Sequence, residues 1–152
     1  MSNHLFILRP SGWVGEGKIQ LNMMEEELGY STRWSITEKD SNGQIACLQE
    51  IQVKGISDVM QNQFLFFDLG SKNFSIELDN PSIGKILGKG VLTDQLIAWE
   101  FRLASKEFEG VEVYERQSDD SYLMYAEYAT ADQLRTIIRG KVWQDLLPPL
   151  KE

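Results

Sequence analysis

Hydrophobic and polar residues alternate with a period of two over most of this chain. The segment 95–104 places Trp99 and Phe101 on one face and Glu100 on the other, and 73–79 alternates in the same way. An antiparallel strand with one buried and one solvated face gives this period, whereas an amphipathic helix repeats every 3.6 residues. The pattern therefore predicts an all-β chain.

Short segments rich in Gly, Asn, Asp, Ser and Pro separate the alternating runs, as chain reversals require. We expect about ten strands, with bounds that sequence patterns define to within ~2–4 residues. They are 13–24, 29–39, 44–53, 60–69, 73–79, 85–93, 95–104, 108–117, 121–130 and 133–143. Short connections make sequence neighbours pair, and closure hides the two edge strands. The predicted fold is a single antiparallel meander β-barrel of about ten strands over residues 1–152, with a short flexible tail from about residue 146.

The segment 130–143 carries signals for two kinds of element. Thr130 and Gln133 have the spacing of a helix capping box. Against a helix stand its β-branched residues and Gly140, and a barrel needs a last strand to pair with the first. We predict a strand here.

The net charge of −8, from 23 acidic and 15 basic residues, changes the expected partners. An acidic surface repels phosphate backbones and anionic lipids, so we expect neither nucleic acid nor a membrane as partner. No apolar run reaches the ~20 residues of a membrane-spanning helix, and the N-terminus does not resemble a signal peptide. Cys47, the one cysteine, cannot form an internal disulfide. We therefore expect a cytoplasmic protein.

The stretch SGWVGEGKI, residues 11–19, has three glycines close to a tryptophan. A phosphate-binding loop would need a strand before the glycines and a helix after them, but here an alternating strand follows. The glycines therefore belong to the first strand, where the backbone bends or another backbone approaches closely. Trp13 is expected to fill the closed end of the barrel.

With these glycines, the chain resembles the calycin superfamily of lipocalins and fatty-acid-binding proteins, and most of all the nitrobindin motif Gly-x-Trp-x-Gly-x-Gly. Gly12, Trp13, Gly15 and Gly17 match it, with one residue missing between the first Gly and the Trp. Nitrobindins hold haem through a histidine near the C-terminus. The single histidine of this chain is His4, which we expect to lie on a mobile N-terminus, so the resemblance does not extend to haem.

Catalytic and metal chemistry find little support in the sequence. No strand carries a histidine that could serve a nucleophile as base, and one His and one Cys cannot build a zinc site. Glu100 and Glu112, on adjacent predicted strands, could form an acid/base pair, but Glu100 alternates outward. We predict no catalytic residue, no metal and no cofactor.

A ligand pocket inside the barrel is the preferred hypothesis, because about ten strands enclose more space than eight. Its predicted lining consists of aromatic residues on inward faces and a few polar residues that orient a ligand. The lining residues are Trp34, Phe66, Trp99 and Phe101, with Tyr114, Tyr125 and Arg139 as polar contacts.

Fatty-acid-binding proteins hold a carboxylate with Arg and Tyr on their last strands, and the pairing of Arg139 with Tyr125 resembles that arrangement. In the alternative interpretation Arg139 pairs with a surface acid such as Glu127. An inward Arg139 would be desolvated and would need an anion or a hydroxyl partner.

Three functions remain open at this point. The protein is a binding or carrier protein for a small, mostly apolar molecule, an enzyme of the isomerase or lyase type that uses the same pocket, or a solid barrel acting as a protein-interaction module. The absence of a nucleophile–base pair favours the carrier over the enzyme.

Overall fold

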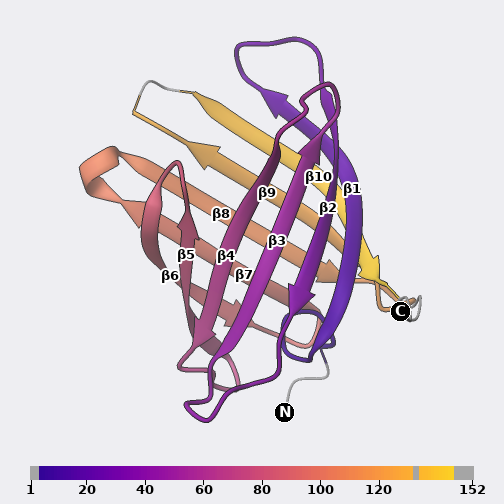
Figure 1. The fold of residues 1–152 in the computed structure, drawn as a ribbon, viewed down its shortest axis with the longest axis vertical. Coiled ribbons are helices and arrows are strands. Elements are labelled where there is room, and N and C mark those ends of the chain that lie inside the picture. Colours follow the sequence, from indigo (N-terminus) through magenta and orange to yellow (C-terminus); the bar gives the residue numbers. More distant parts are fainter. Residues whose placement is uncertain (1–3, 132–133, 146–152) are drawn as a thin grey trace.

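The computed structural model describes residues 4–131 and 134–145, which form a closed barrel of ten antiparallel strands (Figure 1). Each strand pairs with the next, and β1 pairs with β10 to close the barrel. The strands are β1 (Ser11–Leu21), β2 (Leu28–Ile36), β3 (Ile45–Val53), β4 (Val59–Phe67), β5 (Asn73–Asn80), β6 (Gly84–Leu92), β7 (Leu96–Leu103), β8 (Phe108–Arg116), β9 (Tyr122–Ala129) and β10 (Arg135–Gln144), with a 3-10 turn η1 (Ala104–Lys106) between β7 and β8. The predicted all-β meander barrel is confirmed, and the tail predicted from residue 146 lies outside the described residues.

The ambiguous segment before the C-terminus forms strand β10. It pairs with β9 on one side and with β1 on the other, so both of its edges are hydrogen-bonded. The β-branched side chains of Thr136, Ile137 and Ile138 suit this environment. The predicted strand is confirmed, since the segment closes the barrel by pairing with β1 on one side and with β9 on the other.

Glycines allow the close approach of β1 and β10 at the seam of the barrel. A Cβ atom on Gly15 would lie 2.6 Å from the carbonyl oxygen of Lys141, and one on Gly17 would overlap the carbonyl of Arg139. A larger residue at either position would force the two backbones apart. The glycines therefore belong to a strand, as the sequence predicts.

Residues 4–10 fold across one end of the barrel, which we call the closed end. Phe6 is fully buried there, and its ring centroid lies 5.1 Å from that of Trp13 and 5.5 Å from that of Tyr122. His4 is also buried, with hydrogen bonds of 2.6 Å to the Tyr122 hydroxyl and to the Thr93 carbonyl oxygen. The expectation of a mobile His4 is wrong, because the closed end offers its ring two polar partners, the Tyr122 hydroxyl and the Thr93 carbonyl oxygen.

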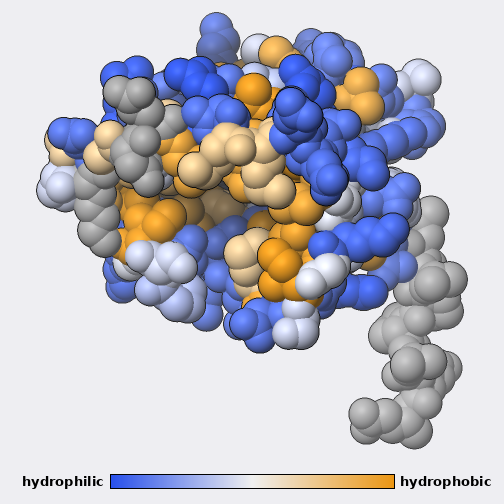
Figure 2. Space-filling view, turned by 90° about the horizontal axis from the view of Figure 1, so that it is seen from above, coloured by the Kyte–Doolittle hydropathy of each residue, from blue (hydrophilic) through white to orange (hydrophobic). Residues whose placement is uncertain are grey.

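The opposite end, which we call the open end, is bordered by the β1–β2, β3–β4, β5–β6, β7–β8 and β9–β10 connections. Several inward-facing residues near it are only half-buried, among them Tyr30, Asn62 and Ile138. A view onto this end shows a hollow surrounded by hydrophobic side chains (Figure 2). In the described part of the chain, no helix has the length and hydrophobicity needed to span a bilayer.

Candidate ligand-binding site

The wall formed by β2 to β5 carries a chain of polar side chains on its inner face, one from each strand. Asn80 Nδ2 donates to Asn62 Oδ1 at 3.1 Å, and Asn62 Nδ2 donates to Gln49 Oε1 at 3.1 Å. Gln49 Nε2 then donates to Thr32 Oγ1 at 3.2 Å, and this hydroxyl donates to the Glu50 carbonyl at 2.9 Å. We call Thr32, Gln49, Asn62 and Asn80 the amide chain. Each member of the amide chain forms a hydrogen bond with another member, so these buried polar groups have partners in the protein itself and do not need a ligand.

The facing wall carries a buried carboxylate. Glu112 lies on the inner face of β8 between Gly110 and Tyr114 and is only 4% exposed. The Tyr114 hydroxyl donates to Oε1 at 2.9 Å, and the Tyr128 hydroxyl of β9 donates to Oε2. Among the described residues no lysine or arginine forms an ion pair with this carboxylate. A buried negative charge without a cation is uncommon in a structural core.

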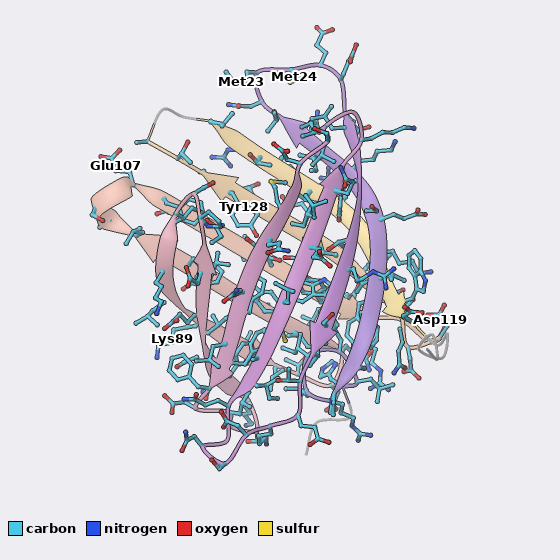
Figure 3. All side chains as sticks on the ribbon, in the orientation of Figure 1. Met23, Met24, Lys89, Glu107, Asp119 and Tyr128 are labelled. Carbon is cyan, nitrogen blue, oxygen red and sulfur yellow. The ribbon has the colours of Figure 1, made fainter. Side chains whose placement is uncertain are left out.

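Two glycines make room for the tyrosines around Glu112. A Cβ atom on Gly110 would overlap the ring of Tyr128, and one on Gly140 would overlap the hydroxyl of Tyr30. Tyr128 lies inside the barrel below the rim, while Met23 and Met24 lie on the connection above it (Figure 3). The small residues on β8 and β10 therefore let large polar rings enter the interior.

Burial dominates the electrostatics of this cluster. It raises the pKa of Glu112, although hydrogen bonds from Tyr128 and Tyr114 and the nearby indole of Trp99 oppose the shift. Burial and the charge of Glu112 together raise the pKa of Tyr114 and Tyr128 well above 10, and that of Tyr30 to about 12. The three phenols therefore stay protonated near neutral pH and keep their hydrogen-bond donors.

Two indole groups next to this cluster lack a hydrogen bond. The Nε1 atoms of Trp34 and Trp99 are buried and find no partner within hydrogen-bond geometry among the described residues. The Trp99 indole comes near enough to Glu112 to favour its ionised form without completing a hydrogen bond. Buried N–H groups rarely lack a hydrogen-bond acceptor.

The predicted aromatic lining faces inward but does not enclose open space. Trp34, Phe66, Trp99 and Phe101 are each at most 2% exposed. Trp34 and Phe66 both lie in ring contact with Trp99, with centroids 6.4 Å and 5.7 Å from it. These rings fill the middle of the barrel. Parity placed Trp34, Trp99 and Phe101 on the correct face, whereas the segment around Phe66 is apolar on both faces and gave no parity signal. The packing of these rings against one another was not visible in the sequence.

The predicted pair of Tyr125 and Arg139 lies on the outer face, so the expectation that both point inward is wrong. The Arg139 guanidinium stands over the Tyr125 ring, 5.4 Å from its centroid, and the Tyr125 hydroxyl donates to Glu127 at 3.0 Å. Both side chains border a depression of about 380 Å³ on the outside of β7 to β10. The outer face suits them because a solvated guanidinium needs no buried anion. Tyr114, the third predicted polar contact, does face inward and bonds to Glu112.

The carboxylates of Glu100 and Glu112 do not form a pair. Glu100 is exposed on the outer face of β7, whereas Glu112 is buried inside the barrel. Trp99 is the register partner of Glu112, which places Glu100 one residue away and on the other side of the sheet. An acid/base pair of these two residues is excluded by geometry.

Metal chemistry finds no further support in the described residues, which contain no group of three or more His, Cys, Asp or Glu able to hold an ion. Both ring nitrogens of His4 are engaged in hydrogen bonds. Burial raises the pKa of the Cys47 thiol to about 12, so it stays protonated as a core residue.

Sequence reasoning missed the amide chain, Tyr30 and Tyr128, and it named Glu112 only as half of a carboxylate pair. One signal was present: Glu112 shares a face with Gly110 and Tyr114 in an otherwise alternating strand. An acid on the apolar parity of a strand points to a buried charge. The amide chain gave no such signal, because its members come from four different strands.

Comparison with known proteins gives a structural match and no sequence match. No protein-family model and no curated protein sequence matches the chain. An S-type phycobiliprotein lyase, CPES from Guillardia theta, superposes with a TM-score of 0.70 over 91% of this chain and 89% of that one, at 9% sequence identity. The fold is calycin-like. At this identity the similarity extends to the barrel and not to individual residues.

Proposed function

We propose that this protein binds a small, mostly apolar molecule in the open end of its barrel. The observation that carries the proposal is the change in the interior along the barrel axis. Close-packed rings fill the middle, where Glu112 is the register partner of Trp99 and Gln49 that of Trp34. Nearer the open end the inner face carries half-buried residues such as Asn62 and Ile138, and the view onto this end shows a hollow surrounded by hydrophobic side chains (Figure 2). Concave sites with apolar walls and a few convergent polar groups are typical of small-molecule binding.

The test uses N-phenyl-1-naphthylamine, an uncharged dye whose fluorescence rises in apolar surroundings. We expect saturable binding to the wild-type protein. Ile138→Trp should abolish it, because Ile138 is half-buried on the inner face of β10 near the open end and a larger ring there fills the hollow.

Ile137→Trp is the matched control. Ile137 has the same side chain one residue away, on the outer face, where it is the register partner of Glu127. It should leave dye binding intact. Absence of dye binding to the wild type, or equal binding by both variants, would contradict a site inside the open end.

A second candidate is enzymatic, of the lyase or isomerase type. It is favoured by Glu112, a carboxyl group of raised pKa that contacts two phenols, because such a group can act as a general acid or base. The structural neighbour is itself a lyase by name. Native mass spectrometry of freshly purified protein can identify a retained host molecule. Conversion of that molecule by the wild type, and not by Glu112→Gln, would support catalysis over transport.

A further inference from the structure

The interior of the barrel carries very few acidic or basic side chains, and the acidic one and the basic one lie apart. At the inward-facing strand positions, all of which belong to the described chain, Glu112 is the one carboxylate and Arg116 is the one basic residue. Arg116 lies near the closed end, where its guanidinium pairs with Asp120 at 2.8 Å. Toward the open end the interior therefore carries one carboxyl group, that of Glu112, and no basic side chain at the inward-facing strand positions.

The surroundings of Glu112 are aromatic. Tyr114 and Tyr128 bond to its oxygens, Trp99 is its register partner with a ring centroid 5.1 Å from that of Tyr114, and the charge of Glu112 acts on Tyr30. Each carboxylate oxygen can accept more than one hydrogen bond, so both retain acceptor capacity after the tyrosines have donated. Aromatic faces attract cations, and rings grouped around a site recognise alkylated ammonium groups.

We infer that the molecule held in the open end carries an alkylammonium group, whose charge pairs with Glu112 between these aromatic rings. The inference rests on the proposed function, since it specifies the ligand of the same site. A bound cation would favour the ionised form of Glu112, whose hydrogen-bond partners Tyr114 and Tyr128 are both neutral. A carboxylate ligand, such as a fatty acid, would meet repulsion there instead.

Displacement of N-phenyl-1-naphthylamine by four ligands, each with a straight chain of ten carbons (in the carboxylate this includes the carboxyl carbon), tests the inference. The ligands are decyltrimethylammonium, decylammonium, decanol and decanoate, all compared at about 0.15 M salt, where the Debye length of about 8 Å screens the distant surface charges. We expect both ammonium ligands to displace the dye from the wild type at concentrations about tenfold or more below those of decanol and decanoate. A tenfold ratio corresponds to the free energy of about one charge-assisted hydrogen bond.

Two variants locate the origin of this preference. Glu112→Gln keeps the side-chain shape and should remove the advantage of the ammonium ligands. Glu100→Gln removes the same charge from the exposed face of the neighbouring strand and should preserve it. The permanent cation decyltrimethylammonium should also bind more tightly as the pH rises and Glu112 ionises.

The outcomes separate the two proposals. If the dye binds and decanol displaces it as well as the ammonium ligands do, or if the preference survives Glu112→Gln, the ammonium inference is wrong and the apolar site stands. If the dye does not bind at all, the proposed function fails. Since the wild-type comparison needs no variant, the inference can be overturned even if Glu112→Gln does not fold.

Discussion

The two ends of the barrel are built from the same alternating strands but filled in different ways. At the closed end, rings from residues 4–10 and from several strands pack against one another, and burial stabilises them without strict geometry. At the open end, amide, hydroxyl and carboxyl groups hold one another through hydrogen bonds. The closed end is therefore held together by packed rings and the open end by polar hydrogen bonds, and it is at the open end that we propose another molecule binds.

The largest expected effect is a test of the closed end. Phe6→Ala should lower the free energy of unfolding by about 3–5 kcal/mol, because it removes a fully buried ring at the centre of the cluster. Met60→Ala, at the rim of the open end where the side chain is 49% exposed, should cost well under about 1 kcal/mol. Urea denaturation measures both. Equal losses would remove the distinction between a packed and an open end.

A smaller effect is expected in the amide chain. Gln49→Ala should lower the free energy of unfolding by about 1–3 kcal/mol, because Thr32 and Asn62 each lose a partner in a buried or half-buried position. Gln63→Ala is the control, since Gln63 is exposed on the outer face of β4, and its effect should stay within about 0.5 kcal/mol. A harmless Gln49→Ala would mean that water replaces the amide and that this wall does not depend on its hydrogen bonds.

Acidification should lower the contribution of the closed end to the free energy of unfolding and raise that of the open end. His4 tests the closed end. Burial lowers the pKa of His4 below 6.5, so the unfolded chain takes up a proton before the folded one does. The stabilising contribution of neutral His4 is therefore present above pH 6.5 and falls as the pH drops below it. At pH 8 His4→Ala should cost about 1–2 kcal/mol through its lost hydrogen bonds, and the difference from wild type should shrink at pH 5. A difference that grows on acidification would contradict a neutral, buried His4.

Glu112 tests the open end and gives the smallest effect on stability. Its pKa is raised from 4.5 by burial, so the folded protein holds the proton more tightly than the unfolded chain. This contribution is present below pH 4.5 and is lost as the pH rises through the folded-state pKa. Glu112→Gln should differ from wild type by less than about 1 kcal/mol in acid and become relatively more stable as the pH rises. Thermal melts across the pH range check this, with Glu100→Gln as the control that should show no such trend.

Much of the fold could be predicted from the sequence, because alternation and turn composition are local properties. The ten strands and their order follow from them, and alternation assigned the aromatic residues on β2 and β7 to the correct face, while Phe66 on β4 lies in a run that is apolar on both faces. Strand β9 shows the limit. Its Tyr122, Met124, Ala126 and Tyr128 face inward, while Leu123 and Tyr125 face outward. Both parities carry tyrosines and apolar residues, so alternation could not tell which tyrosine enters the barrel.

By itself, then, the sequence determined the secondary structure, the meander and the seam at which glycines let β1 meet β10. Only the tertiary structure decided that residues 4–10 cover the end at which Trp13 lies, that His4 is buried there, and that Glu112 lies among Tyr114, Tyr128 and Trp99. The physical reason is that strand geometry is encoded within a few neighbouring residues. The environment of an inward-facing side chain is set instead by strand register and by residues from distant strands that meet only when the barrel closes.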